Sequence, residues 1–332
     1  MSAKQQDNRE RQALLDAAEA ASGLKEARER IRAQEAVIQE QAETIERMRA
    51  ATRLELPTAA PLDAGRDSYL RLIVPDIHGS QCDRHAVAAL LRDVEMLSDQ
   101  VREVVWLGDV IDCSGFLAQH HVLSAVAETR YTFEEDVAAA VQVLDRVAEL
   151  TPHAEHHFIE GNHEARIEKW CVTQSLRNNI DAGYLLRCHG VEANLQLAAR
   201  GWHHYKANEC YGDCAVPATI RLGECYFCHG FSTAKNAAAK VLERFGRHSV
   251  VFGHIHRAQS ASTQVVDKDG SNYAFCPGCL SLRQPTWRHS SPTTWTHGFA
   301  LQLVSKSGRF LHVQVPIVEG DSLLVPLAER II

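Results

Sequence analysis

The sequence predicts an α/β domain preceded by one long helix, and two observations support this fold class. Residues 3–52 contain no proline and a single glycine, and they are rich in alanine, glutamate, glutamine and arginine, which favours continuous helix. From Ser68 onward, short apolar runs alternate with amphipathic segments, as strands and helices alternate in an α/β sheet. A chain of 332 residues with 45% hydrophobic content can bury a sizeable core.

The N-terminal helix carries a seven-residue repeat of apolar side chains, at Leu24, Ile31, Ile38 and Ile45. As a positions of a heptad these residues suit a parallel two-stranded coiled coil, whereas glutamines at d positions 34 and 41 weaken it. We therefore predict that residues 1–52 join copies of the chain into a homo-oligomer. A solvated single helix, or one folded back on the domain, is the alternative.

Residues 53–67 contain Pro57, Pro61 and Gly65, which predicts a linker. Residues 68–332 are then expected to form one domain. Its expected order is strand 69–75, helix 85–97, strand 101–107, helix 132–150, strand 156–160, a strand ending at 226–228, helix 233–245 and strand 249–252. Thr132 and Glu135 have the spacing of a helix-capping box.

Two stretches differ from this alternation. Residues 170–222 mix polar turns with short apolar pieces, and we expect them to form an insertion that caps the functional site. From Ser260 on, successive antiparallel strands are expected at 264–266, 273–275, 298–304 and 310–315.

Bulk properties exclude several classes of protein. The net charge of −7 does not favour broad duplex binding through lysine and arginine. No apolar run approaches 18 residues, which predicts no membrane span, and the charged N-terminus lacks the apolar core of a secretory signal. The ten cysteines are then expected to be reduced and the protein to be cytoplasmic.

Two cysteine pairs have the CxxC spacing of a structural zinc site. However, Cys225 and Cys228 lie in a strand-like run, where three-residue spacing puts them on opposite faces. Cys276 and Cys279 flank a Pro-Gly turn. We favour packing roles for both pairs over a zinc site.

Five short motifs in fixed order supply oxygen and imidazole groups, and most of them end an apolar run. They are Asp76-Ile77-His78, Gly108-Asp109-Val110-Ile111-Asp112, Gly161-Asn162-His163-Glu164, His229-Gly230 and Gly253-His254-Ile255-His256. Alternate residues of an extended segment point the same way, so Asp76 with His78 can bind one ion, and His254 with His256 is again an i, i+2 pair. The carboxylate of Asp109 can bridge two cations, while Asn162 offers a neutral oxygen.

In content and order the motifs resemble those of the calcineurin-like metallophosphoesterase superfamily, from about Tyr69 to Val315. The resemblance implies a four-layer α/β/β/α sandwich of two mixed sheets. It also implies two divalent metal ions, one held by Asp76, His78, Asp109 and His256, and the other by Asp109, Asn162, His229 and His254. A metal-bridging hydroxide would then attack the phosphorus of a phosphoester.

His189 is an alternative to His229 as a ligand, because the sequence Cys-His-Gly occurs at 188–190 as well as at 228–230. His229 follows a strand-like run and precedes a helix and the strand leading to His254, as the family pattern requires. We therefore prefer His229 to His189.

The resemblance also implies two catalytic side chains that bind no metal. His163 would act as a general acid or charge stabiliser at the leaving oxygen, and Asp112 would orient it. A helix N-cap is the alternative role for Asp112. Arg257, next to His256, is a candidate substrate contact, although a surface arginine is equally consistent with its position.

The substrate class is harder to predict. The serine/threonine phosphatase branch has an arginine after the position of Asp112, where this chain has Cys113, so we favour a phosphodiesterase or nuclease over a phosphomonoesterase. The aromatic and basic residues of 202–211 could stack the bases of a nucleic acid or nucleotide, or simply pack the cap. A non-catalytic metal-bound scaffold is the third alternative. Nitrogen and oxygen ligands suit manganese, iron or zinc, of which manganese is the first choice.

Overall fold

The structure, a computed structural model, describes residues 3–51, 68–113, 132–264, 271–285, 292–322 and 324. The chain divides into two compact units, Met1–Leu62 and Asp63–Ile332. The predicted linker at 53–67 lies outside the described residues, and the predicted domain boundaries remain a prediction.

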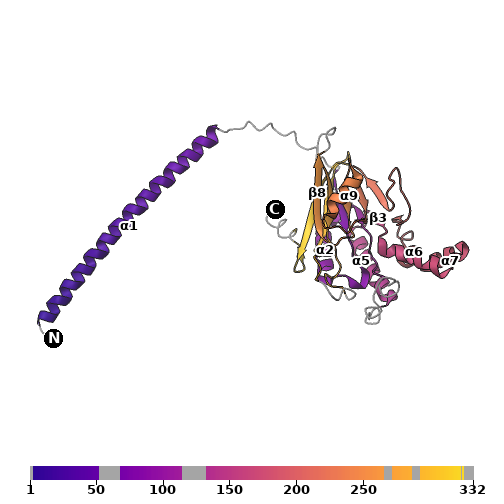
Figure 1. Cartoon of the computed structure of the whole chain (residues 1–332), viewed down its shortest axis with the longest axis horizontal. Helices are drawn as coiled ribbons and strands as arrows, with labels where there is room; N and C mark the ends of the chain where they lie inside the picture. The colour runs from indigo at the N-terminus through magenta and orange to yellow at the C-terminus, as the bar shows by residue number, and fades with distance from the viewer. Residues whose placement is uncertain are drawn as a thin grey trace. The chain divides into compact units, whose positions relative to one another are not determined.

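The first unit contains one helix of 49 residues, α1 (Ala3–Ala51), as the sequence predicts (Figure 1). Every side chain that is described on α1 is exposed. Leu24, Ile31 and Ile38 of the seven-residue repeat are 57%, 53% and 64% exposed, so this apolar row is open to a partner.

The second unit is built on two mixed sheets. The first has the order β12-β11-β10-β1-β2-β3-β4, in which β1 to β4 run parallel and β10 to β12 antiparallel. Its strands are β1 (Tyr69–Val74), β2 (Val101–Trp106), β3 (Glu155–Ile159), β4 (His203–Tyr205), β10 (His297–Val304), β11 (Phe310–Val318) and β12 (Asp321–Ser322).

The second sheet has the order β5-β6-β7-β9-β8, with a parallel centre of β6, β7 and β9 between antiparallel edges. Its strands are β5 (Thr219–Leu222), β6 (Cys225–Cys228), β7 (Ser249–Phe252), β8 (Ala258–Gln264) and β9 (Ser271–Pro277).

Helices cover the outer face of each sheet. They are α2 (Arg84–Leu97), α5 (Phe133–Leu150), α6 (Asn162–Gln174), α7 (Asn179–His189), α8 (Val191–Leu195) and α9 (Ala237–Phe245), with short 3-10 turns at Gly79–Gln81 and Ser98–Gln100. Figure 1 shows α2 and α5 in the same part of the unit, and these two helices contact each other. Thr132 and Glu135 form the predicted capping box at the start of α5.

Three apolar clusters define the layers. One packs α2 and α5 on the first sheet, a second packs α9 on the second sheet, and the third lies between the sheets. Alternate residues of one strand enter different clusters: Leu72 and Val74 face the helices, whereas Ile73 faces the opposite sheet. The implied four-layer α/β/β/α sandwich is therefore confirmed.

The segment 170–222 contributes a strand to each sheet, and its role as a cap over the functional site stays a prediction. Its strands include β4, which extends the first sheet beside β3, and β5, which forms an edge of the second sheet. The rings of 202–211 also pack internally: Trp202 stacks on His156 with ring centroids 4.3 Å apart, and His203 stacks on His157 at 4.9 Å. Packing within the domain thus accounts for the contacts of Trp202 and His203.

The C-terminal strands follow the expected antiparallel succession within two pairs, β8 with β9 and β10 with β11, but not between these pairs. β9 pairs in parallel with β7, and the chain then crosses to the first sheet, where β10 pairs with β1. The expected strand at 264–266 appears as the end of β8 at Gln264, and residues 265 and 266 lie outside the described residues.

The cysteines follow the packing prediction. Cys225 lies in the cluster between the sheets and Cys228 in the cluster beneath α9, on opposite faces of β6. All ten cysteines are free thiols, and no group of described residues that could hold a metal ion contains one. None of the described helices combines the length and apolar character needed to cross a membrane.

Candidate metal centre

The ends of parallel strands bring the predicted ligands together. Asp76 follows β1, Asp109 follows β2 and Asn162 follows β3 in the first sheet, while His229 follows β6 and His254 follows β7 in the second. Parallel strands in one sheet end on the same edge, and the two edges meet here. Backbone hydrogen bonds join the loops: His78 N–H donates to the Asp109 carbonyl at 2.9 Å, and Gly253 N–H donates to the His229 carbonyl at 2.9 Å.

Unusual backbone conformations concentrate in these loops. His78, Asp109, His254 and His256 all have positive φ, between 50° and 72°, although none of them is glycine. Such conformations are costly for residues with a Cβ and cluster at functional sites. The surrounding hydrogen bonds hold the side chains in positions that an ordinary strand end would not give them.

Two glycines allow the loops to approach each other closely. Gly108 has φ of 90°, and a Cβ there would lie 2.5 Å from the Gly161 nitrogen. A Cβ at Gly253 would lie 2.5 Å from Oδ2 of Asp76. Larger side chains at either position would force the ligand-bearing loops apart.

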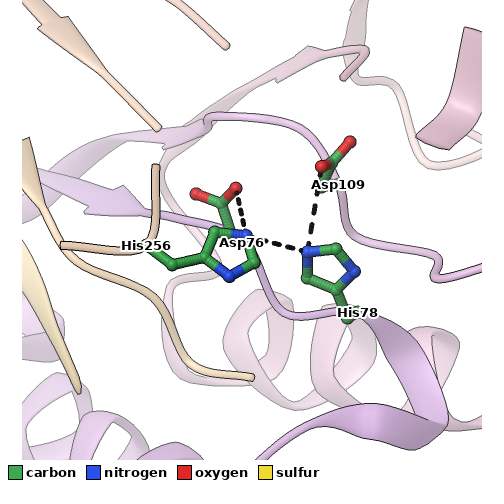
Figure 2. A group of neighbouring side chains, drawn as sticks. All are labelled: Asp76, His78, Asp109 and His256. Atoms are coloured by element: carbon green, nitrogen blue, oxygen red, sulfur yellow. Dashed lines mark hydrogen bonds and ion pairs between the residues drawn. The ribbon is translucent and has the colours of Figure 1, made fainter. Parts of the chain in front are cut away.

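One group of converging side chains is enclosed, and we call it the enclosed site. Its members are Asp76, His78, Asp109 and His256, each at most 4% exposed. Nε2 of His256 lies 3.1 Å from Oδ1 of Asp76 and 3.1 Å from Nε2 of His78, which in turn lies 3.8 Å from Oδ2 of Asp109. Figure 2 shows the four side chains pointing toward one another.

A second group shares Asp109 and is less covered, and we call it the open site. Nε2 of His229 lies 3.2 Å from Oδ2 of Asp109, 3.0 Å from Oδ1 of Asn162 and 3.2 Å from Nδ1 of His254. Asn162 is exposed and His254 half-buried. His189, the alternative to His229, lies instead at the end of α7 against Trp170.

The donor chemistry fits cations at both sites. Imidazole nitrogens face one another, His78 toward His256 and His229 toward His254, with carboxylate oxygens beside them. Two unprotonated nitrogens at this separation repel each other unless a proton or a cation lies between them. Imidazole and carboxylate are ligands for manganese, iron and zinc alike.

The match to known families extends over most of the region that carries this geometry. The family model of calcineurin-like phosphoesterases matches residues 71–258. The chain belongs to the calcineurin-like phosphoesterase family. No curated protein matches the sequence. Among solved structures, Vps29 of Chaetomium thermophilum is similar at 11% identity and a TM-score of 0.34, over 74% of this chain and 96% of that one. This likeness is too slight to carry an argument about function.

In this member of the family, hydrogen bonds to the second ring nitrogen orient two of the imidazoles. Nδ1 of His229 donates to the Leu107 carbonyl at 2.8 Å, and Nδ1 of His78 donates to Oδ1 of Asp112 at 2.8 Å. Each bond fixes the tautomer and leaves Nε2 free for a cation.

Two buried carboxylates that sequence reasoning missed hold the loop of residues 108–113. Glu164 accepts hydrogen bonds from the backbone N–H groups of Asp109, Val110, Ile111 and Gly161, at 2.8 to 3.0 Å. Asp136 accepts from the N–H groups of Ser80, Asp112 and Cys113, each at 2.9 Å. Glu164 was visible in its motif without a role, and Asp136 could be suspected only from its place in the first turn of α5.

Asp112 contacts His163 differently from the orientation that the resemblance implies. Its carboxylate bonds His78 and lies 3.7 Å from Nδ1 of His163, while its carbonyl oxygen is in close contact with that nitrogen. The carboxylate therefore orients an imidazole of the enclosed site, and the backbone of Asp112 orients His163.

The two remaining predicted residues, His163 and Arg257, differ in where they lie relative to the metal centre. Nε2 of His163 is 3.7 Å from Oδ2 of Asp109, so its ring borders the metal centre. The Arg257 guanidinium donates to the Ala234 carbonyl at 3.1 Å, outside the converging groups. Trp295, which sequence reasoning missed, packs edge-on against His256 with ring centroids 4.0 Å apart.

Mutual proximity shifts the pKa values of the buried groups. Burial disfavours the charged forms, but the imidazoles beside Asp76 and Asp109 hold the pKa of both carboxyls below the ordinary range. Burial alone would lower the pKa of an imidazole. The neighbouring carboxylates outweigh it: Asp112 and Asp109 raise the pKa of His78 to about 9, and Asp109 raises that of His229 to about 10. Burial lowers the pKa of His163 to about 4 and raises that of Glu164 to about 7 and that of Asp136 to about 6.

Proposed function

We propose that the protein is a binuclear metal-dependent phosphoester hydrolase that acts on phosphodiesters. One observation carries this proposal: the carboxylate of Asp109 belongs to two groups of converging ligands at once. Asp76, His78, Asp109 and His256 would hold one cation, and Asp109, Asn162, His229 and His254 the other. Manganese is our first choice of cation, with iron and zinc as alternatives.

Each group of the protein has a separate task in this proposal. When bound, the two cations supply Lewis acidity toward the phosphoryl oxygens and toward the attacking water. His163 stands at the rim, where the leaving oxygen of the ester would lie. An anionic ester beside Nε2 raises the pKa of His163 from its low value, so the imidazolium can protonate the leaving oxygen.

The diester preference rests on position 113. The Cys113 side chain is 1% exposed and packs in the apolar cluster beneath the helices, so this position presents no cation to the dianion of a monoester. Trp202 and His203 stack on histidines of this domain, so they give no separate support to a nuclease. We therefore propose the diester class without a preference for polynucleotide.

Hydrolysis of bis-p-nitrophenyl phosphate by the manganese-loaded protein tests this function directly. A panel of mononucleotides, cyclic nucleotides, single-stranded DNA, RNA and phosphopeptide then separates diesters from monoesters. Absence of turnover on every substrate, with two cations bound, would favour the non-catalytic scaffold.

We also propose that α1 pairs with a second copy of itself in a parallel coiled coil. Its exposed apolar row needs a partner, and Arg30 and Glu35 stand at g and e positions, where parallel helices bring opposite charges together. Deleting residues 1–52 should leave an active monomer. Light scattering that shows the same mass with and without the helix would contradict the coiled coil.

The free thiols fit a reducing, cytoplasmic setting.

A further inference from the structure

One guanidinium lies beside the metal centre. Arg166 is on α6, three residues after His163, and is half-buried. Its Nη1 atom lies 3.2 Å from Nδ1 of His163. His163 in turn lies beside both sites, with its Nε2 3.7 Å from Oδ2 of the shared Asp109 and its ring 4.5 Å from that of His78.

The contact between Arg166 and His163 is not a satisfied hydrogen bond. Nδ1 of His163 is in close contact with the Asp112 carbonyl oxygen, which can only accept, so Nδ1 carries the proton. Two donors therefore face each other. Among the described residues, no carboxylate lies within ion-pair distance of the Arg166 guanidinium. Its five N–H groups have a positive charge and no anionic partner there.

The position matters because an anion has to bind at this rim. His163 lies next to Asp109 on one side and next to Arg166 on the other, at 3.7 and 3.2 Å. Cys113, where related phosphatases carry an arginine, is buried among apolar side chains. Arg166 thus offers a guanidinium from α6 that matches the one negative charge of a diester, while position 113 adds no second cation for the dianion of a monoester.

We propose that Arg166 binds the substrate phosphate through its non-bridging oxygens while the leaving oxygen faces His163. This proposal rests on the function proposed above. A planar guanidinium donates two parallel hydrogen bonds to phosphate, which lysine cannot reproduce. Phosphate would displace the unfavourable donor–donor contact with His163.

Binding of inorganic phosphate to the manganese-loaded full chain tests the proposal without requiring turnover. In Arg166→Ala, calorimetry should show a dissociation constant for phosphate at least about tenfold weaker. Arg166→Lys should fall between the two. Lys169→Ala removes the same charge from the same helix, away from His163, and should bind as wild type does. Unchanged phosphate affinity in Arg166→Ala would overturn the proposal.

Metal content and thermal melting show whether Arg166→Ala is still folded and loaded. If that variant loses metal, Arg166→Lys decides, because it keeps the charge and the aliphatic stem. Wild-type phosphate affinity in a loaded Arg166→Lys would then count against paired hydrogen bonds and overturn the proposal.

Kinetics separates this proposal from the proposed function. For bis-p-nitrophenyl phosphate, Arg166→Ala should raise KM about tenfold or more and change kcat less. If the wild type hydrolyses no ester but its phosphate binding depends on Arg166, the hydrolase fails and the arginine contact stands. If the wild type is active and Arg166→Ala retains its KM and its phosphate affinity, the hydrolase stands and the arginine contact fails.

Discussion

The enclosed and open sites share Asp109 but differ in cover and support. All four ligands of the enclosed site are buried, and Asp112 orients His78 from beneath. The open site includes an exposed asparagine and a half-buried histidine. Enclosure favours slow exchange of the bound cation, whereas an open position is where substrate can enter the coordination shell. The difference indicates that a phosphoester approaches from the side of Asn162, while His163 borders the shared Asp109 and the ring of His78.

Substitution of Asp109, the carboxylate that both sites share, should have the largest effect on activity. Asp109→Asn should lower kcat by more than roughly 10³-fold, because both sites lose their common charged ligand. Turnover of bis-p-nitrophenyl phosphate and metal content measure the effect, with the exposed Asp213→Asn as the control. Full activity in Asp109→Asn would refute a two-metal centre.

Removing His163 should separate chemistry from metal binding. His163→Ala is expected to lower kcat by roughly 10²- to 10⁴-fold, the usual contribution of a general acid, while both cations stay bound. Elemental analysis beside the kinetics distinguishes the two effects, and the exposed His153→Ala serves as a control. A variant with one cation missing would assign His163 to the ligands instead.

Weakening the hydrogen bond between Asp112 and His78 should change the cation affinity of the enclosed site more than that of the open site. Asp112→Asn weakens the bond that orients His78, so cation affinity should fall by about 10- to 100-fold at the enclosed site and little at the open site. Titration with manganese, read as two binding phases, measures this. Equal weakening of both phases would show that Asp112 supports the whole centre through its backbone.

The pH dependence of cation affinity, which arises from competition with protons, should be the smallest of these effects. In the metal-free protein, His229 and His78 have pKa values raised to about 10 and 9, so below those values each holds a proton that a cation must displace. Apparent cation affinity should therefore rise with pH, by up to about tenfold per unit for each proton released, and level off above about pH 10. Calorimetry in buffers of different ionisation enthalpy counts the protons. A pH-independent affinity would contradict protonated ligands.

Much of the fold followed from local pattern. β7 (Ser249–Phe252) begins and ends where its apolar run predicts, and α5 begins at the predicted cap. Local pattern failed where pairing is non-local. Tyr205 and Ile220 lie in short strands that are stable only because β3 and β6 pair with them. No local signal distinguishes such edge strands from the loops around them.

The sequence by itself determined the chemical identity of the candidate ligands and their placement at strand ends, because an apolar run is a local property. Only the tertiary structure decided that the Asp112 carboxylate serves His78, and that Glu164 and Asp136 hold one loop between them. Arg166 acquires its significance in the same way. These relations depend on how two sheets and α6 pack, and side chains far apart in sequence meet only after that packing has formed.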